Sequence, residues 1–166
     1  VAPHVGAPSG QPPQAAGDTG LDDPYGIEPM SKPKKVGNPS RDLYDAAWIG
    51  NFDGAFEAME EGADPNKVFG VRKITAMHVA ARTGNAWVLG MLIKSGRADV
   101  NIPNKDGETP LFGAVLEDHV GTTQTLVEAK ADINWRDQAG KTVLSIAKER
   151  GKQKFVDFLT SSGATE

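Results

Sequence analysis

The chain of 166 residues lacks several features that point to particular classes of protein. It has no cysteine, which excludes disulfide bonds, a cysteine-ligated zinc site and a cysteine nucleophile. It has no excess of positive charge, because 22 acidic residues outnumber 18 lysines and arginines, and non-specific nucleic-acid binding needs a basic surface. No apolar run approaches the ~20 residues of a membrane-spanning helix. We therefore expect neither nucleic-acid binding nor a membrane span.

Catalytic and cofactor motifs are also missing. The three histidines, His4, His78 and His119, do not have the spacing of metal ligands. The sequence contains no P-loop, no dinucleotide-binding G-x-G-x-x-G after a strand and no G-x-S-x-G nucleophile motif. We therefore predict that the protein is not an enzyme and has no metal, no cofactor and no small-molecule substrate.

Residues 1–40 differ in composition from the rest of the chain. They hold eight of the 11 prolines and six of the 19 glycines, and their apolar residues follow no helical or strand period. Such a segment cannot bury enough apolar surface to offset the entropy of ordering it. We interpret it as an extended N-terminal arm whose Tyr25, Ile27 and Met30 dock on another surface, with a flexible linker as the alternative. Its lysine-rich stretch 32–35 suits an acidic surface, a phosphate or simply solvent.

A repeat begins after the arm. One apolar residue recurs in each of four units, at spacings of 34, 34 and 33: Leu43, Met77, Leu111 and Leu144. The first three units close with similar stretches, GADPN, GRADVN and KADIN, and the second opens with TAMHVA. This pattern is similar to the T-P-L-H-x-A motif and the period of ankyrin repeats. The chain thus resembles the ankyrin repeat family over residues 41–166.

The resemblance implies an all-α ankyrin-repeat solenoid of helix–turn–helix units, joined by short β-hairpin fingers and preceded by the extended arm. The expected units cover about residues 41–74, 75–108, 109–141 and 142–166. No unit buries its apolar face alone, so neighbours must stack. The turn between the two helices suits a left-handed residue, which Gly50, Gly84 and Gly151 supply. Asp118 takes this place in the third unit.

The first helix of each unit needs a residue that caps its free amide groups. The expected caps in units two to four are threonines: Thr75, Thr109 and Thr142. In unit one, Asp42 or Ser40 is the expected cap. The resemblance implies that His78 is a structural hydrogen-bonding residue rather than a catalyst.

The second helix of each unit is expected to bury bulky apolar residues, such as Phe52, Phe56 and Met59 in unit one. Unit three departs most from the family pattern. Phe112 replaces the histidine, Gly113 weakens the first helix, and the second helix is poor in apolar mass. We expect this unit to be the softest of the four or to be shaped by a contact.

In the ankyrin family, partners usually meet the finger tips and the outer row of the first helices. Carried over to this sequence, the finger positions are Phe69, Val71, Arg72, Lys73, Lys105, Asp106 and Arg136. The helix positions are Trp48, Ile49, Arg82 and Leu116. All three tryptophans lie outside the expected core positions, and tryptophan is enriched in interface hot spots. We therefore add Trp87 and Trp135 to the predicted surface, with local packing as the alternative for each tryptophan.

These observations predict a non-catalytic protein–protein interaction module. We favour an accessory or scaffolding subunit of a larger complex, with the arm docked on its neighbours. One alternative is a regulatory adaptor that binds a short peptide in the concave groove while the arm is disordered. Another is a fragment of a longer enzyme or channel. The first residue is Val rather than Met, which fits either a fragment or removal of a presequence, and the latter would suit an intracellular site such as a chloroplast or mitochondrion.

Overall fold

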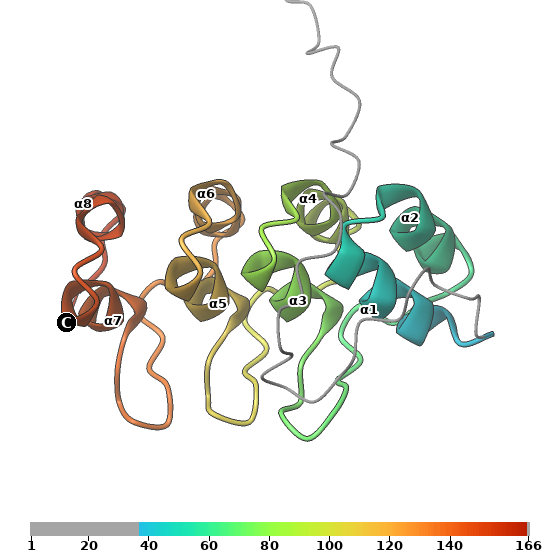
Figure 1. Cartoon of the computed structure of the whole chain (residues 1–166), viewed down its shortest axis with the longest axis horizontal. Helices are drawn as coiled ribbons and strands as arrows, with labels where there is room; N and C mark the ends of the chain where they lie inside the picture. Colours follow the sequence, from blue (N-terminus) through green and yellow to red (C-terminus); the bar gives the residue numbers. More distant parts are fainter. Residues whose placement is uncertain (1–36, 166) are drawn as a thin grey trace, which may run out of the picture.

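The computed structural model describes residues 37–165, so the predicted docking positions Tyr25, Ile27 and Met30 lie outside the described residues. The described part contains eight α-helices. They are α1 (Pro39–Ile49), α2 (Phe52–Glu60), α3 (Ala76–Arg82), α4 (Ala86–Lys94), α5 (Pro110–Leu116), α6 (Val120–Glu128), α7 (Val143–Glu149) and α8 (Gln153–Ser161). Odd-numbered helices form one row, and even-numbered helices form a second row, which lies above the first in the view of Figure 1. The expected solenoid of four helix pairs is therefore confirmed.

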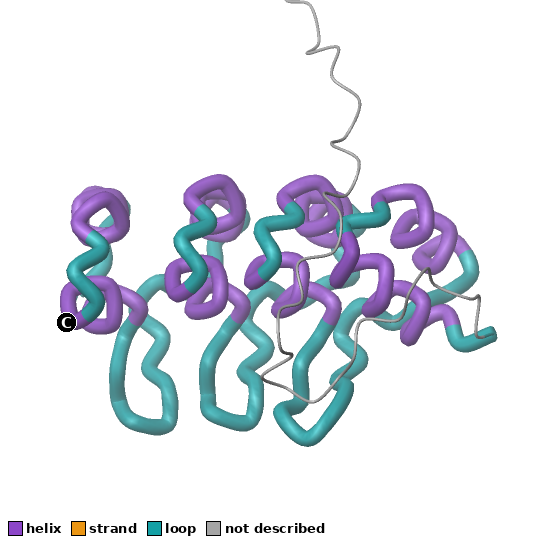
Figure 2. The backbone as a smooth tube through the Cα atoms, in the orientation of Figure 1, coloured by secondary structure: helices purple, strands orange, loops and turns teal. Residues whose placement is uncertain are grey.

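Three longer loops connect successive helix pairs and project from the side of the odd-numbered row (Figure 2). The first is closed by two reciprocal backbone hydrogen bonds between Phe69 and Ile74, at 2.8 and 2.9 Å. The second is closed by the Asn104 amide on the Glu108 carbonyl at 2.8 Å, and the third by the Asp137 amide on the Lys141 carbonyl at 2.9 Å. Within residues 37–165 these fingers are hairpin loops without named strands.

The helix caps agree with the sequence in part. The side chains of Thr75 and Thr142 each accept a hydrogen bond from the backbone amide three residues later, at His78 and Ser145. The side chains of His78 and Ser145 in turn accept a hydrogen bond from the backbone amide of the threonine. Thr109 also occupies the cap position of its helix, but its hydroxyl makes no capping bond. The residue three places on is Phe112, whose ring has no polar atom to share.

The expected cap of α1 is wrong. Asn38 caps this helix by accepting from the Arg41 amide at 3.3 Å, and Pro39 fills the first helical position, where its missing amide donor costs nothing. Ser40 instead accepts from the Asp64 amide at 2.9 Å. The helix therefore begins earlier than Asp42 implied, and its start is tied to the loop that follows α2.

The turns inside the helix pairs confirm the expected backbone. Gly50, Gly84 and Gly151 have φ values of 73°, 74° and 66°, and Asp118 has a φ of 64°. The left-handed conformation is costly for most side chains, and aspartate is among those that tolerate it best. Unit three thus keeps the family turn with a residue other than glycine.

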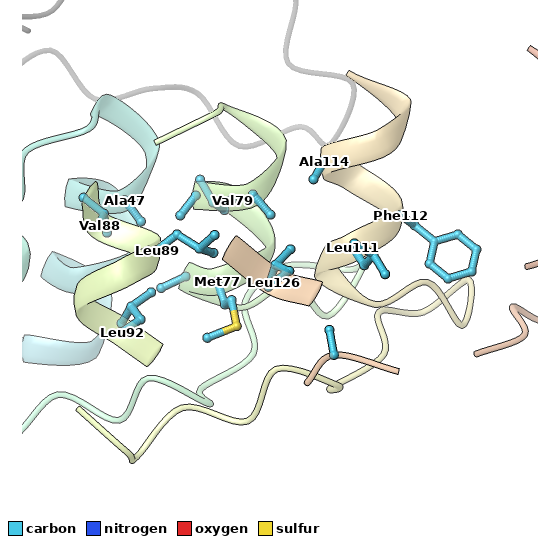
Figure 3. Close-up of a cluster of buried hydrophobic side chains, with 14 of the residues drawn as sticks. Ala47, Met77, Val79, Val88, Leu89, Leu92, Leu111, Phe112, Ala114 and Leu126 are labelled. Carbon is cyan, nitrogen blue, oxygen red and sulfur yellow. The ribbon is translucent and has the colours of Figure 1, made fainter. Parts of the chain in front are cut away.

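The core runs through the stack between the two helix rows. Residues from neighbouring units interleave, among them Ala47, Met77, Leu89, Leu111 and Leu126 (Figure 3). Each unit therefore completes the core of the next, which is why the repeats cannot fold as separate units.

The core of unit one differs from the sequence-based expectation. Helix α2 buries Ala55, Ala58 and Met59, whereas Phe56 is 49% exposed and Phe52 is half-buried. Phe52 and Phe56 are four residues apart and so share one face of the helix, and this face points away from the core. The prediction that Phe56 is a core residue is wrong, because the apolar pattern of α2 has two faces.

Candidate protein-binding surface

The three fingers are joined into one row by hydrogen bonds between neighbours. The Lys105 amide donates to the Arg72 carbonyl at 2.8 Å, which links the second finger to the first. The Gln138 amide donates to the Asp106 carbonyl at 3.1 Å, and the Gln138 side chain donates to the Lys105 carbonyl at 2.6 Å. The tips are therefore held relative to one another before any partner binds.

The tip of the first finger presents an apolar residue among charges. Val71 is 79% exposed, and Lys73 beside it is exposed with a left-handed φ of 55°. Arg72 pairs with Asp106 across to the second finger at 3.6 Å. These four predicted residues lie together at the tips of two adjacent fingers, as the sequence implied.

Phe69 supports the first finger rather than extending from it. Its ring lies 4.9 Å from the ring of buried Tyr44, centroid to centroid. The Arg41 guanidinium lies 5.4 Å from the Tyr44 ring centroid and 5.8 Å from that of Phe69, a geometry that allows cation–π attraction to both rings. This cluster anchors the base of the finger to α1.

Trp135 has a similar supporting role at the third finger. Its indole Nε1 donates to the Gly107 carbonyl of the second finger at 2.9 Å, and its ring is half-buried. Local packing, the alternative reading of this tryptophan, therefore explains its position. Its neighbour Arg136 is exposed and donates to the Gly140 carbonyl at 2.8 Å, while Lys105 is exposed on the second finger.

The row of odd-numbered helices lies directly above the fingers in the view of Figure 1. Trp48, Ile49 and Leu116 are half-buried there, and Arg82 forms an ion pair with Glu117 at 3.0 Å. A hollow between Trp48, Arg82 and Leu116 has a volume of about 30 Å³. That is the space of about one water molecule, so the row can meet another protein surface but does not enclose a substrate.

Gly113 lies in this row beside Arg82. A Cβ atom at this position would lie 3.4 Å from the Cβ of Arg82, which is an ordinary van der Waals contact. The packing of α5 on α3 therefore does not by itself require glycine at this position.

His78 lies under this surface as a buried structural residue. Its Nε2 is 3.1 Å from the Glu108 carbonyl oxygen, and a carbonyl can only accept, so Nε2 carries the proton. Nδ1 then accepts from the Thr75 amide at 3.3 Å and from its hydroxyl at 2.8 Å. Burial lowers the pKa of His78 to about 4, although the bond to the Glu108 carbonyl opposes this shift. The neutral ring joins α3 to the second finger, which agrees with its expected structural role.

Trp87 does not belong to the finger and helix row. It lies on α4, in the even-numbered row, and is 56% exposed. The predicted residues thus divide between two faces of the stack. Sequence reasoning missed the residues that accompany Trp87, because Phe52 and Phe56 occupy positions that were predicted to be buried in the core.

The described residues form neither a metal site nor a membrane-spanning helix. Between positions 37 and 165, no group of three or more histidine, aspartate or glutamate side chains is placed to hold a metal ion. The helices of this part of the chain are also too short or too polar to cross a membrane.

Comparison with known proteins agrees with the geometry. The family model for ankyrin repeats (3 copies) matches residues 43–137 and 98–165. The chain is 32% identical over 94 residues to alpha-latrocrustotoxin-Lt1a of Latrodectus tredecimguttatus and 33% identical over 88 residues to Inversin of Mus musculus. It is 36% identical over 91 residues to Neurogenic locus notch homolog protein 1 of Xenopus tropicalis.

These similarities are local in the relatives. They cover 57%, 53% and 54% of this chain, but only 6%, 8% and 4% of the respective relatives. The chain therefore spans a small part of the length of the proteins it matches. Its repeat spacing, stacked helix pairs and linked fingers agree with the family model, and the chain belongs to the ankyrin repeat family, whose fold is a protein-binding module.

Proposed function

We propose that this chain is a non-catalytic accessory or scaffolding subunit of a larger complex, which binds its partner through the finger tips and the helix row. The linked fingers support this proposal most directly. Their tips carry exposed Val71, Lys73 and Lys105 on loops that are already hydrogen-bonded to one another. A surface fixed in advance loses little conformational entropy on binding.

The chemistry of the tips suggests the kind of partner surface. Val71 supplies an apolar contact, and Lys73 and Lys105 are cations beside it. A complementary surface would offer an apolar pocket bordered by carboxylates. In this proposal the N-terminal arm adds a second contact within the same assembly.

The proposal is tested by capturing the partner with the full chain and then weakening the tip. The variant Val71→Ser with Lys73→Glu should reduce affinity for the captured partner at least about tenfold, as loss of a central apolar contact does. Thr160→Ser with Lys154→Glu is the matched control, because both residues are exposed on α8 and the change has the same charge. Equal binding by the tip variant and the control would reject the fingers as the contact surface.

A second candidate is a regulatory adaptor that binds a short peptide in the concave groove, where the half-buried Trp48, Ile49 and Leu116 offer apolar contacts. Removal of residues 1–36 separates the two candidates, since it leaves the Asn38 cap of α1 in place. An adaptor should keep its affinity without the arm, whereas an assembly subunit should dissociate from its complex. Size-exclusion chromatography with the captured partner distinguishes these outcomes.

A further inference from the structure

An apolar groove lies between α2 and α4, in the row of even-numbered helices, on the side of the stack away from the fingers. Its volume is about 800 Å³, far more than the hollow beside Arg82. The apolar side chains that line it are Phe52, Phe56, Met59, Trp87 and Met91. Phe56 is 49% and Trp87 56% exposed, an uncommon state for two large aromatic side chains side by side on neighbouring helices.

The groove has a limited extent along the stack. Counting one repeat of 34 residues onward, Trp87 and Met91 of α4 correspond to Gly121 and Thr125 of α6. Thr125 itself lies at the edge of the groove. The apolar lining therefore belongs to the first two units and stops at the third.

Charged side chains stand at one end of the groove. Lys94 is the last residue of α4, Arg97 lies three residues beyond it, and Glu60 is the last residue of α2. The Arg97 guanidinium is fixed there, because it donates to the Met59 carbonyl at 3.3 Å and to the Ala63 carbonyl at 2.6 Å. Among the residues that line the groove, these two cations outnumber the single carboxylate of Glu60, which leaves the lining of this end positive.

The chain enters the repeat stack at this same end. The Ser40 hydroxyl accepts from the Asp64 amide at 2.9 Å, and Asp64 directly follows Ala63, whose carbonyl binds Arg97. Ser40, near the start of the described residues, therefore lies beside the loop that fixes Arg97 at the positive end of the groove.

We propose that residues 21–30 (LDDPYGIEPM) occupy this groove in the free protein. This segment carries four large apolar residues and three carboxylates: Leu21, Tyr25, Ile27, Met30, Asp22, Asp23 and Glu28. The apolar residues match the aromatic lining, and the carboxylates match Lys94 and Arg97.

Residues 31–36, the tether between the segment and Gly37, have a length that suits this contact. Met30 is seven residues from Gly37, which allows a reach of up to about 25 Å. Helix α2 has 9 residues, and such a helix is about 13 Å long. A tether of this size gives an effective concentration in the millimolar range, so even weak apolar contacts keep the groove covered. The arm then reaches a neighbouring subunit only after it leaves the groove.

The absence of cysteine gives a direct test in the full chain. The pair Ile27→Cys with Gly90→Cys places one thiol in the segment and one in the groove, and a Cβ at Gly90 has no atom within 4 Å. The matched control pairs Ile27→Cys with Glu57→Cys, because Glu57 is exposed on α2 but lines a different hollow from the groove. Under mild oxidation, the rate of intramolecular disulfide formation should be at least about tenfold higher at Gly90 than at Glu57.

A charge exchange tests the assigned contacts. Lys94→Glu in the Gly90 pair should slow disulfide formation about threefold, and Glu28→Lys in the same chain should restore the rate. Should oxidation disturb the fold, a photoreactive benzoylphenylalanine in place of Phe56 should form its intramolecular adduct with residues 21–30. Equal rates at Gly90 and Glu57, or crosslinks that join two chains instead of one, would overturn the proposal. Because no partner takes part, these outcomes are independent of the role proposed for the fingers.

Discussion

Units two and three share a backbone but hold it with different side chains. In unit two, Thr75 and His78 bond to each other at the start of α3, and a glycine makes the turn to α4. In unit three, Thr109 is followed by Phe112, and Asp118 makes the turn to α6 with the same left-handed φ. The family shape thus tolerates the loss of its usual polar cap and of its usual glycine within one unit.

The second helices of the two units differ in the same way. Val88 and Leu89 of α4 correspond to Thr122 and Thr123 of α6, and all four are buried. The Thr123 hydroxyl donates to the His119 carbonyl at 2.8 Å, and that of Thr122 donates to the same carbonyl at 3.1 Å. A hydroxyl that returns to the backbone of its own helix carries no unpaired polar group into the core. Low apolar mass in α6 is therefore compatible with a closed core.

The outer faces of the same helices also differ. α4 presents Trp87 and Met91 to the groove, whereas α6 has Gly121 and Thr125 at these positions. Unit two has the more regular core and the more unusual surface. Core regularity and functional surface are separate properties of a repeat, since they use different faces of the same helices.

The largest expected difference between the two units is a dependence of stability on pH. The pKa of His78 falls from 6.5 to about 4 in the folded chain, so the unfolded chain binds more protons between these values. His78 therefore contributes stability fully above about pH 6.5 and loses it as the pH falls toward 4. Between pH 7 and 5 this loss is about 2 kcal/mol. Urea unfolding at several pH values measures it.

The variant His78→Phe copies unit three and removes this titration. We expect it to be less stable than the parent at pH 7, because Thr75 loses a hydrogen-bond partner. Its stability should fall about 2 kcal/mol less than that of the parent between pH 7 and 5. Carboxylates titrate in both proteins, so the difference isolates the histidine. Parallel pH curves would show that burial of His78 does not control its protonation.

The second difference concerns the two threonine caps. Thr75→Val removes the capping oxygen and a partner of His78, and should lower the free energy of unfolding by about 1–2 kcal/mol. Thr109→Val removes a buried hydroxyl that has no hydrogen-bond partner within the described residues, and should change stability by less than about 0.5 kcal/mol or raise it slightly. Urea unfolding of both variants at pH 7 compares them directly. Equal losses would mean that the Thr109 hydroxyl caps α5 in solution.

The sequence was sufficient for the fold because the repeat is encoded by regular features. Apolar residues at a period near 34, threonines before the first helices and glycines in the turns each have one local cause. The left-handed backbone conformation of Asp118 could be predicted from its position in the repeat, although the residue is not a glycine. The cap of α1 was missed because Asn38 lies among prolines, in a stretch that was read as arm.

The candidate surfaces were harder to read from the sequence. Finger positions could be carried over from the family, but hydrogen bonds between fingers connect residues about 33 apart and leave no local pattern. The groove was missed because Phe52, Phe56 and Met59 look like one apolar face. Only packing shows that Ala55 and Ala58 fill the core together with Met59, whereas Phe52 and Phe56 line the groove. A helix with small residues on one side and large ones on another is ambiguous until its neighbours are placed.

The smallest expected effect concerns the turn of unit three. Asp118→Gly would give unit three the glycine of unit two and remove the cost of a left-handed φ at a non-glycine residue. Two terms oppose this gain. The unfolded chain becomes more flexible, and the ion pair between Asp118 and Lys152 at 2.6 Å is lost. That pair contributes little, because the Asp118 side chain is 67% exposed. We therefore expect a net gain of about 0.5 kcal/mol in thermal or urea unfolding. Asp118→Asn is the control, since it removes the charge but keeps a residue that tolerates this conformation. A loss of equal size in both variants would show that the ion pair, rather than the backbone, decides the stability of this turn.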